Sequence, residues 1–549
     1  MSVATAGPRP GHHAAARSGG STLTGTGTMI RFVLRRDRVR LPIWIGAIVL
    51  SVVGSLPAFP ETYPTAADRQ ARAALLDNPA TVALTGPAYG TDDYTFGAMT
   101  ANELLGFVAI AVALMSVLLM VRHTRAEEET GRTELLRAGV LGRHAPTTAA
   151  FVVVAGANLL IGLLLAVLMP ATLAELSASS SLLFGAAVAS VGLVFTGVGA
   201  LAAQVTEHAR AATGIGAAAV GVAFALRAIG DVGNAALSWM SPIGWAQRTR
   251  VYVDDRWWPL LLAVGLTVVL VALAFATTSR RDVGAGLVPP RPGSPRGRAG
   301  LSTPFGLALR LQRGGLIGWG VGLVVFGLAY GSLASSIEEF VSDNSTLQDM
   351  LGDSGTLIDG FMAIVVLMMA LLAAAYGLTA VLRLRSEETS GRGEPVLATA
   401  VSRVRFAGSH LAVAVGGSLL LMLAGGLSLA LTASLALDDA SVFGTLLGAA
   451  VAHLPGIWLV IAVAVALVGL APQLVHLSWV VLTYGVVVGV LGGFFQFPGW
   501  VTKISPFQAA SPLPGGDLGT VAVVIMVVLA VALFGIGLLG FRRRDMTTT

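Results

Sequence analysis

The 549-residue sequence contains no cysteine, and lysine occurs once, at Lys503. Without cysteine the chain cannot form disulfides, use a thiolate nucleophile or ligate a metal through sulfur. The phosphate-binding loop of many ATPases reads Gly-x-x-x-x-Gly-Lys-Ser/Thr, and its lysine reaches the nucleotide phosphates. Lys503 follows Thr502 rather than glycine and precedes Ile504. The chain therefore carries no ATPase motif of this kind, and we expect it to have no catalytic residues, no resident metal and no cofactor of its own.

Charged residues are also scarce, at 12% of the chain, whereas hydrophobic residues make up 55%. Soluble domains carry about 25% charged residues, and many runs here reach the ~20 apolar residues that span a bilayer core. The net charge of +5 could suggest a nucleic-acid partner, but the arginines gather at the ends of apolar runs, where membrane topology explains them. The composition therefore predicts an all-α integral membrane protein that lies in a lipid bilayer and binds no nucleic acid.

Twelve apolar runs follow one another in two sets of six. The runs of the first set lie near residues 41–56, 104–121, 148–169, 181–203, 211–229 and 258–277. The runs of the second set lie near residues 315–335, 359–382, 408–436, 441–470, 474–494 and 518–541. The run 441–470 is longer than a span requires, and Pro455 inside it predicts a break because proline cannot donate a helical hydrogen bond.

The two sets of runs share a sequence pattern. Leu34, Arg35, Arg38, Leu41 and Trp44 are matched by Leu309, Arg310, Arg313, Leu316 and Trp319, and Arg281-Asp282 is matched by Arg544-Asp545. About twelve transmembrane helices should therefore form two parallel six-helix pseudo-repeats, related by an axis along the membrane normal. We divide the chain into a disordered cytoplasmic tail (1–28), a first half (29–283), a cytoplasmic linker (284–303) and a second half (304–549).

The distribution of arginine predicts the orientation. Basic residues concentrate at 31–40, 122–143, 280–313, 383–405 and 542–544, whereas 336–358 contains acidic residues and no Lys or Arg. Basic loops favour the cytoplasmic side, so both termini should lie in the cytoplasm of a multi-pass cell-membrane protein. Residues 29–40 carry arginines on one helical stripe, which is typical of an amphipathic helix at the interface and also of a plain positive flank of the first span. Arg248, Arg250 and Arg256 disagree with the rule, and nearby tryptophans suggest that 230–257 is an interfacial hairpin.

Two charged stretches stand out. Arg125, Glu127, Glu128, Gly131, Arg132 and Glu134 recur 260 residues later as Arg385, Glu387, Glu388, Gly391, Arg392 and Glu394. Glu128 and Arg132 lie four residues apart, so we expect a short helix with an internal ion pair. Glycine costs a helix about 1 kcal/mol, so Gly131 and Gly391 indicate a sharp local shape. Each stretch could still be a plain solvated connector, but its repetition favours a common role.

These stretches resemble the coupling helix of ATP-binding-cassette (ABC) exporter permeases, and the twelve-span form resembles actinobacterial permeases of polyketide and tetronasin-type antibiotic exporters. The resemblance covers most of the chain after residue 28. It implies that residues 127–134 and 387–394 dock onto two copies of a separate cytoplasmic ATPase subunit, which binds ATP and Mg²⁺. It also implies that the Trp239 and Trp500 segments fold back into the outer leaflet, and that a hydrophobic compound is exported. Gly393 and Pro395 depart from the pattern and should shorten the second coupling helix.

Two other functions remain open on the residues alone. A proton-driven secondary transporter is also commonly built from two six-span halves, but it usually needs buried carboxylates as proton relays. Here the carboxylates lie mostly in loops, with Glu103 and Glu175 near span ends. A membrane-embedded enzyme would need a convergent catalytic set, which the sequence does not show. Asn158 and His453 lie inside spans, where a neighbouring helix could satisfy them or a function could require them.

Overall fold

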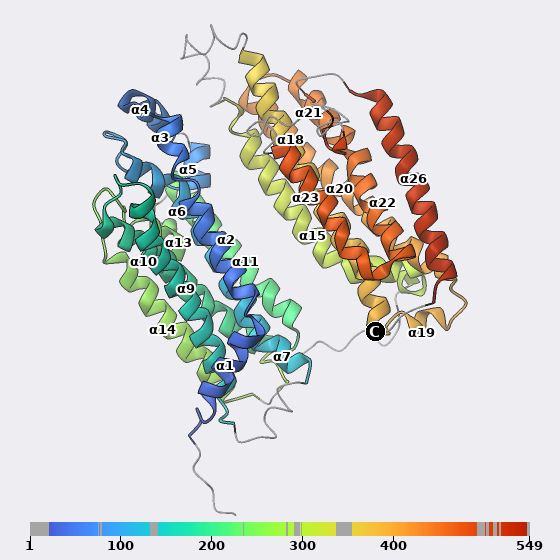
Figure 1. Ribbon diagram of the computed structural model, residues 1–549, viewed down its shortest axis with the longest axis horizontal. Coiled ribbons are helices and arrows are strands. Elements are labelled where there is room, and N and C mark those ends of the chain that lie inside the picture. Colours follow the sequence, from blue (N-terminus) through green and yellow to red (C-terminus); the bar gives the residue numbers. More distant parts are fainter. Residues whose placement is uncertain are drawn as a thin grey trace, which may run out of the picture. The chain divides into compact units, whose positions relative to one another are not determined.

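The computed structural model describes residues 21–74, 76, 79–131, 141–233, 235–281, 284–289, 297, 299–335, 354–490, 500, 504–508, 513–514 and 518–545. Within these residues the secondary structure is helical, without strands (Figure 1). Twelve helices in this part are long and apolar enough to cross a membrane. The all-α membrane fold and the twelve predicted spans are therefore confirmed. The chain separates into two compact units, Met1–Pro292 and Gly293–Thr549, and this division falls inside the predicted linker.

The first unit places one helix at its centre. Helix α10 packs against α6, α9, α11 and α14, and Gly162 of α9 meets Gly185 of α10 so closely that a Cβ on either would strike the other backbone. Small residues let membrane helices approach in this way. The helices of this unit are α1 (Thr26–Arg36), α2 (Arg40–Val53), α3 (Ala58–Thr62), α4 (Ala66–Ala74), α5 (Pro79–Thr85), α6 (Phe96–His123), α7 (Arg125–Glu129), α9 (Ala145–Thr172), α10 (Ala178–Val205), α11 (Ala209–Val232), α12 (Ala235–Ser238), α13 (Pro242–Gln247) and α14 (Pro259–Thr278).

The second unit repeats this arrangement around α22, which packs against α18, α20, α23 and α26. Gly469 of α22 meets the backbone of Gly537 in α26, so close approach through glycine recurs. The predicted break is confirmed: α21 ends at Ala452, and Pro455 lies in the first turn of α22. The helices are η2 (Ala299–Ser302), α15 (Pro304–Gly331), α18 (Ser354–Thr389), α19 (Glu394–Leu397), α20 (Arg403–Ala436), α21 (Ser441–Ala452), α22 (Leu454–Leu470), η3 (Pro472–Leu477), α23 (Ser478–Val490) and α26 (Thr520–Arg543).

The start of the two units differs. The amphipathic segment of the first unit forms the separate helix α1, which buries Met29 and Val33 and packs against α9. It begins at Thr26, and the preceding Thr22 and Thr24 carbonyls accept hydrogen bonds from His144 and Gly142. In the second unit the matching arginines lie inside the continuous helix α15. The two units thus have matching arginines at these positions, but only the first unit has a separate helix before its first span.

The segment between the first two predicted spans contains short helices that the sequence does not predict. Helices α3, α4 and α5 occupy it and lie at the end of the unit opposite α1 and α7 (Figure 1). Arg227 of α11 donates hydrogen bonds to the Val82 and Leu84 carbonyls at 3.2 and 2.9 Å. Arg72 pairs with Glu103 at 2.9 Å. Short helices are difficult to predict here because long-range contacts, rather than an apolar period, hold them in place.

The segment 230–257, which the sequence predicts to be an interfacial hairpin, contains the short helices α12 and α13, and all of α13 is buried. Arg248 pairs with Asp231 at 3.1 Å, while Arg250 and Arg256 both pair with Asp254 at 2.8 and 2.7 Å. Pairing thus offsets the three arginines that disagree with the positive-inside rule. Burial raises the pKa of the Tyr252 phenol to about 12, so the phenol stays neutral in its 2.7 Å hydrogen bond with Ser181.

Asn158 and His453, the two polar span residues that the sequence singles out, both have partners. Asn158 hydrogen-bonds Ser116 of α6 and Thr196 of α10, at 3.0 and 3.2 Å from its amide nitrogen. Nδ1 of His453 lies 2.9 Å from the Ala449 carbonyl of α21. Neighbouring helices therefore satisfy Asn158 as predicted, whereas the partner of His453 belongs to its own span.

Candidate functional site

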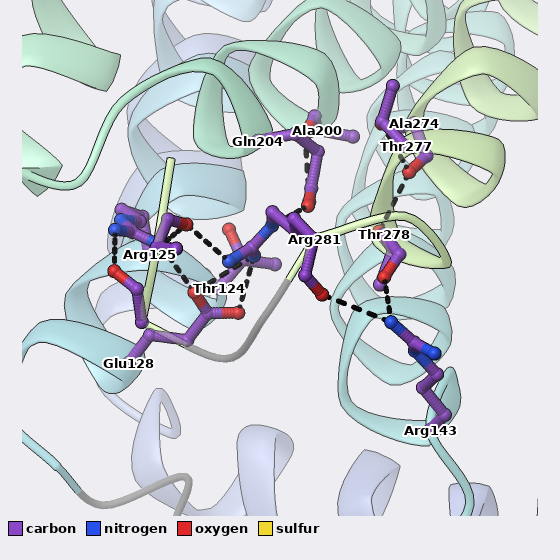
Figure 2. A network of polar contacts seen from close by, with 12 residues as sticks. Thr124, Arg125, Glu128, Arg143, Ala200, Gln204, Ala274, Thr277, Thr278 and Arg281 are labelled. Atoms are coloured by element: carbon purple, nitrogen blue, oxygen red, sulfur yellow. Dashed lines mark hydrogen bonds and ion pairs between the residues drawn. The ribbon is translucent and has the colours of Figure 1, made fainter. Parts of the chain in front are cut away.

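In the first charged stretch, two arginines form ion pairs with Glu128 (Figure 2). Helix α6 ends at His123, and the short helix α7 follows directly. Arg125 donates to Oε2 of Glu128 at 2.6 Å, and Arg281, just beyond α14, reaches Oε1 and Oε2 at 2.7 and 2.9 Å. Arg125 and Arg281 are 1% and 6% exposed at the side chain, and Glu128 is 14% exposed. We call Arg125, Glu128 and Arg281 the first clamp.

The first clamp also fixes the central helix and the segment after the sixth span. Arg281 donates from Nε to Gln204 of α10 at 2.5 Å and from Nη1 to the Ala285 carbonyl at 2.8 Å. Arg125 donates to the Gly284 carbonyl at 2.5 Å. Residues 287 and 288 continue along the end of α10 through backbone hydrogen bonds to Gln204 and Val205. One cluster thus joins the loop, the central helix and the sixth span.

The second unit contains an equivalent cluster of one glutamate and two arginines. Glu388 pairs with Arg385 at 3.0 Å and with Arg544 at 2.5 and 2.7 Å. Arg544 also donates from Nε to the Val468 carbonyl at the end of α22, at 3.1 Å. The Glu388 side chain is completely buried. Arg385, Glu388 and Arg544 form the second clamp, which again joins the loop, the central helix and the end of the sixth span.

The turn that follows each clamp confirms the shape expected of the two glycines. Gly131 and Gly391 have φ values of +71° and +69°, in the left-handed region that side chains rarely adopt. The expected ion pair four residues apart is wrong in the second stretch, where Arg392 pairs with Glu387 at 3.0 Å instead of with Glu388. The left-handed glycine ends the helix before Arg392, so the helical i,i+4 spacing no longer applies. The start of the second stretch continues α18, and a separate four-residue helix, α19, begins at Glu394. The first-unit counterpart of α19 lies outside the described residues, so the shortening expected from Gly393 and Pro395 stays a prediction.

The other predicted site residues have different surroundings. Glu127 pairs with Arg36 of α1, and Glu387 with Arg383 at 2.7 Å. Arg392 and Glu394 are exposed. Arg132 and Glu134 lie outside the described residues. The sequence identified the acidic members of both clamps but gave Arg281 and Arg544 no role, although their repetition as Arg-Asp pairs was the available signal.

The first unit adds contacts between the clamp region and α1. Asp37, directly after α1, is completely buried and lies 2.6 Å from Nε2 of His123 and 3.4 Å from Nε of Arg122. A small cleft lies between α1 and the clamp, and its lining includes Phe32, Arg36, Glu127 and Arg143. Position 312, which corresponds to Asp37, is glutamine in the second unit and lies 3.1 Å from the ring of His410. Only the first clamp is therefore linked by ion pairs to a helix that precedes the first span, within the part of the chain that the structure describes.

Within the described ranges, no group of three His, Asp or Glu residues is placed to hold a metal ion. The fold-back segment implied for the second unit lies mostly outside these ranges. Its visible part includes Ser505 and Phe507, both buried, and the Pro506 carbonyl lies close to Gly456 of α22.

Comparison with known proteins shows the family of the chain. Residues 30–277 and 301–542 match the family described as "Multidrug efflux system permease Rv1217c, C-terminal domain". The chain is 40% identical over 547 residues to the multidrug efflux system permease protein Rv1217c of Mycobacterium tuberculosis (strain ATCC 25618 / H37Rv), and the alignment covers 98% of each chain.

Proposed function

The chain belongs to the Rv1217c family of multidrug efflux system permeases, and we propose that its two clamps couple export to ATP hydrolysed by a separate subunit. The permease forms the membrane-spanning part of an ABC exporter for hydrophobic small molecules. It supplies the pathway, while two copies of a cytoplasmic ATPase subunit bind ATP and Mg²⁺.

The observation that carries this proposal is the equivalence of the two clamps. Each clamp ties a charged loop to the end of the sixth span and to the end of the central helix, through Arg281 and Gln204 in one unit and Arg544 and Val468 in the other. Ion pairs of low exposure resist separation because each partner would lose its counter-charge in a poorly solvated site. A push on either loop would therefore move two spans of that unit together.

The surface left for an ATPase subunit is the outer side of each loop. Glu129 and Thr130 are exposed in the first unit, as are Ser390, Arg392 and Glu394 in the second. The buried carboxylates Glu128 and Glu388 then act by holding the loop in shape, while the exposed residues make the contact. Two loops in one chain provide a docking place for two ATPase subunits.

Reconstitution with the ATPase subunit tests this function. The purified permease should hydrolyse no ATP alone, and addition of the subunit should produce ATP-driven accumulation of a hydrophobic dye in inside-out vesicles. Native mass spectrometry should give one permease with two ATPase subunits. A complex with two permeases, or accumulation that needs a proton gradient and no ATP, would contradict the proposal.

The orientation can be tested because the chain lacks cysteine. Thr65→Cys in the first unit and Ala440→Cys in the second, each at an exposed position away from the clamp of its own unit, should react with an impermeant maleimide on intact cells. Thr130→Cys and Ser390→Cys, beside the clamps, should react only after the membrane is opened. Labelling of the second pair on intact cells would place the clamps outside and exclude an ATPase contact there.

A further inference from the structure

The start of the first unit carries an unusually dense basic surface. Arg31 and Arg35 of α1, Arg38, and Arg40 at the start of α2 are all exposed. No ion pair is formed by these four arginines within the described residues. The acidic groups nearby are engaged elsewhere: Asp37 with Arg122 and His123, and Glu127 with Arg36. The surface formed by Arg31, Arg35, Arg38 and Arg40 is called the arginine stripe below.

The arginine stripe lies at a membrane boundary. The first span begins at Arg40, four residues after α1 ends. Phe32 and Leu34 of α1 are 42% and 46% exposed, so apolar and basic side chains share the uncovered side of this helix. Such a helix is suited to lie among lipid headgroups with its apolar residues in the acyl boundary and its arginines near phosphates.

The opposite side of the same segment reaches the first clamp. Arg36 pairs with Glu127, one residue before the clamp glutamate, and Asp37 pairs with His123 at the end of α6. Arg36 and Glu127 line opposite sides of the cleft between α1 and α7, and their ion pair crosses it. The position of α1 is thus connected to the loop by this ion pair and to the end of α6 by the contacts of Asp37 with Arg122 and His123.

We propose that the arginine stripe binds anionic phospholipids of the adjacent leaflet and that Arg36 and Asp37 transmit this binding to the first clamp. Transport then depends on the anionic lipid content of that leaflet. The inference rests on the proposed coupling function for its readout, but it adds a lipid surface and a regulatory input to one of the two clamps.

The exposed apolar residues favour lipid over an acidic protein surface. An acidic patch on the ATPase subunit could satisfy the arginines, but it would leave Phe32 and Leu34 in water or require an apolar partner beside each charge. An anionic bilayer satisfies both kinds of side chain at once.

The test uses the full permease with its ATPase subunit in vesicles of phosphatidylcholine, alone or with increasing phosphatidylglycerol. ATP-driven transport by the wild type should rise with phosphatidylglycerol. The triple variant Arg31→Gln, Arg35→Gln, Arg38→Gln should lose this dependence and keep the transport rate measured in phosphatidylcholine. Each arginine near an anionic surface contributes ~1 kcal/mol, so the affinity for phosphatidylglycerol, measured by native mass spectrometry, should fall about a hundredfold.

Two further variants separate binding from transmission. The first variant is Asp37→Asn, and the second is Arg36→Gln, which breaks the more exposed pair with Glu127. Both should retain bound phosphatidylglycerol but lose the lipid dependence of transport. The matched control is Arg310→Gln with Arg313→Gln, which removes exposed arginines from the continuous helix α15 and should leave the dependence intact.

The outcomes distinguish the two proposals. Wild-type transport that is driven by ATP but indifferent to phosphatidylglycerol would overturn the lipid inference alone. A triple variant that keeps its lipid and loses the ATPase subunit would show that the stripe docks protein and would also overturn it. Absence of ATP-driven transport in every lipid would overturn the proposed function and this inference together.

Discussion

The two units use the same clamp but bury different members of it. Glu388 is completely buried while Arg385 and Arg544 are 16% and 14% exposed, whereas Glu128 is 14% exposed while Arg125 and Arg281 are 1% and 6% exposed. The arginines of the first clamp also reach backbone carbonyls at Gly284 and Ala285. Arg544 of the second clamp likewise reaches the Val468 and Asp545 carbonyls. The second unit therefore buries the carboxylate of its clamp more deeply, whereas the first unit buries the guanidinium groups more deeply and adds a connection to α1. The units share the ion pairs that join the charged loop to the spans, and they differ in the groups that surround these ion pairs.

The largest expected effect comes from breaking the second clamp. Glu388→Gln removes the counter-charge of two arginines with little exposure. Breaking a buried ion pair in this way typically costs about 3–5 kcal/mol of folding free energy. The variant should unfold at a clearly lower temperature in detergent, followed by tryptophan fluorescence. Glu394→Gln, at an exposed site in the same stretch, should change stability by less than about 0.5 kcal/mol. Equal unfolding temperatures for wild type and Glu388→Gln would contradict the burial of this clamp.

Breaking the first clamp should cost less. Glu128 is 14% exposed and Glu388 is completely buried, and in Glu128→Gln the two arginines retain their bonds to Gly284, Ala285 and Gln204. We therefore expect a loss of about 1–3 kcal/mol, the usual range for an unsatisfied buried group. The same unfolding assay, run beside Glu388→Gln, measures the difference. A loss equal to or larger than that of Glu388→Gln would show that burial of the carboxylate does not set the strength of the clamp.

The glycine turns should give the smallest effect, and an equal one in both units. Alanine at position 131 or 391 would meet nothing within 4 Å, but it would have to adopt a positive φ, at a cost of about 1–2 kcal/mol. Gly408→Ala is the matched control, because its site is equally open but lies inside α20, where alanine is favoured by ~1 kcal/mol. Destabilisation by Gly408→Ala comparable to that of the turn variants would remove the backbone explanation.

The sequence predicts the spans and the acidic loop residues well because both depend on local patterns. Apolar runs fix the helices, Pro455 fixes the break before α22, and the repeated glycines mark the turns. The clamp arginines are harder to predict, because Arg281 lies 153 residues from Glu128 and Arg544 lies 156 residues from Glu388. Residue spacing alone does not predict whether Arg392 pairs with Glu387 or Glu388, because the pairing depends on the backbone angle φ of Gly391. The short helices α3 to α5 depend on contacts such as that of Arg227 with Leu84, which no local period reveals.

The central claim is that Arg281 and Arg544, which lie at the end of the sixth span of each unit, transmit movement of the charged loops to the spans. Its most direct test is the number of dye molecules transported per ATP hydrolysed, measured for wild type, Arg281→Gln, Arg544→Gln and the double variant in vesicles with the ATPase subunit. Loss of a charge-assisted bond of about 1.5–3 kcal/mol should lower this ratio roughly tenfold or more in the double variant, while the ATPase subunit stays bound. Lysine at the same positions should restore part of it. An unchanged ratio in a double variant that is folded and bound to its ATPase subunit would contradict the claim.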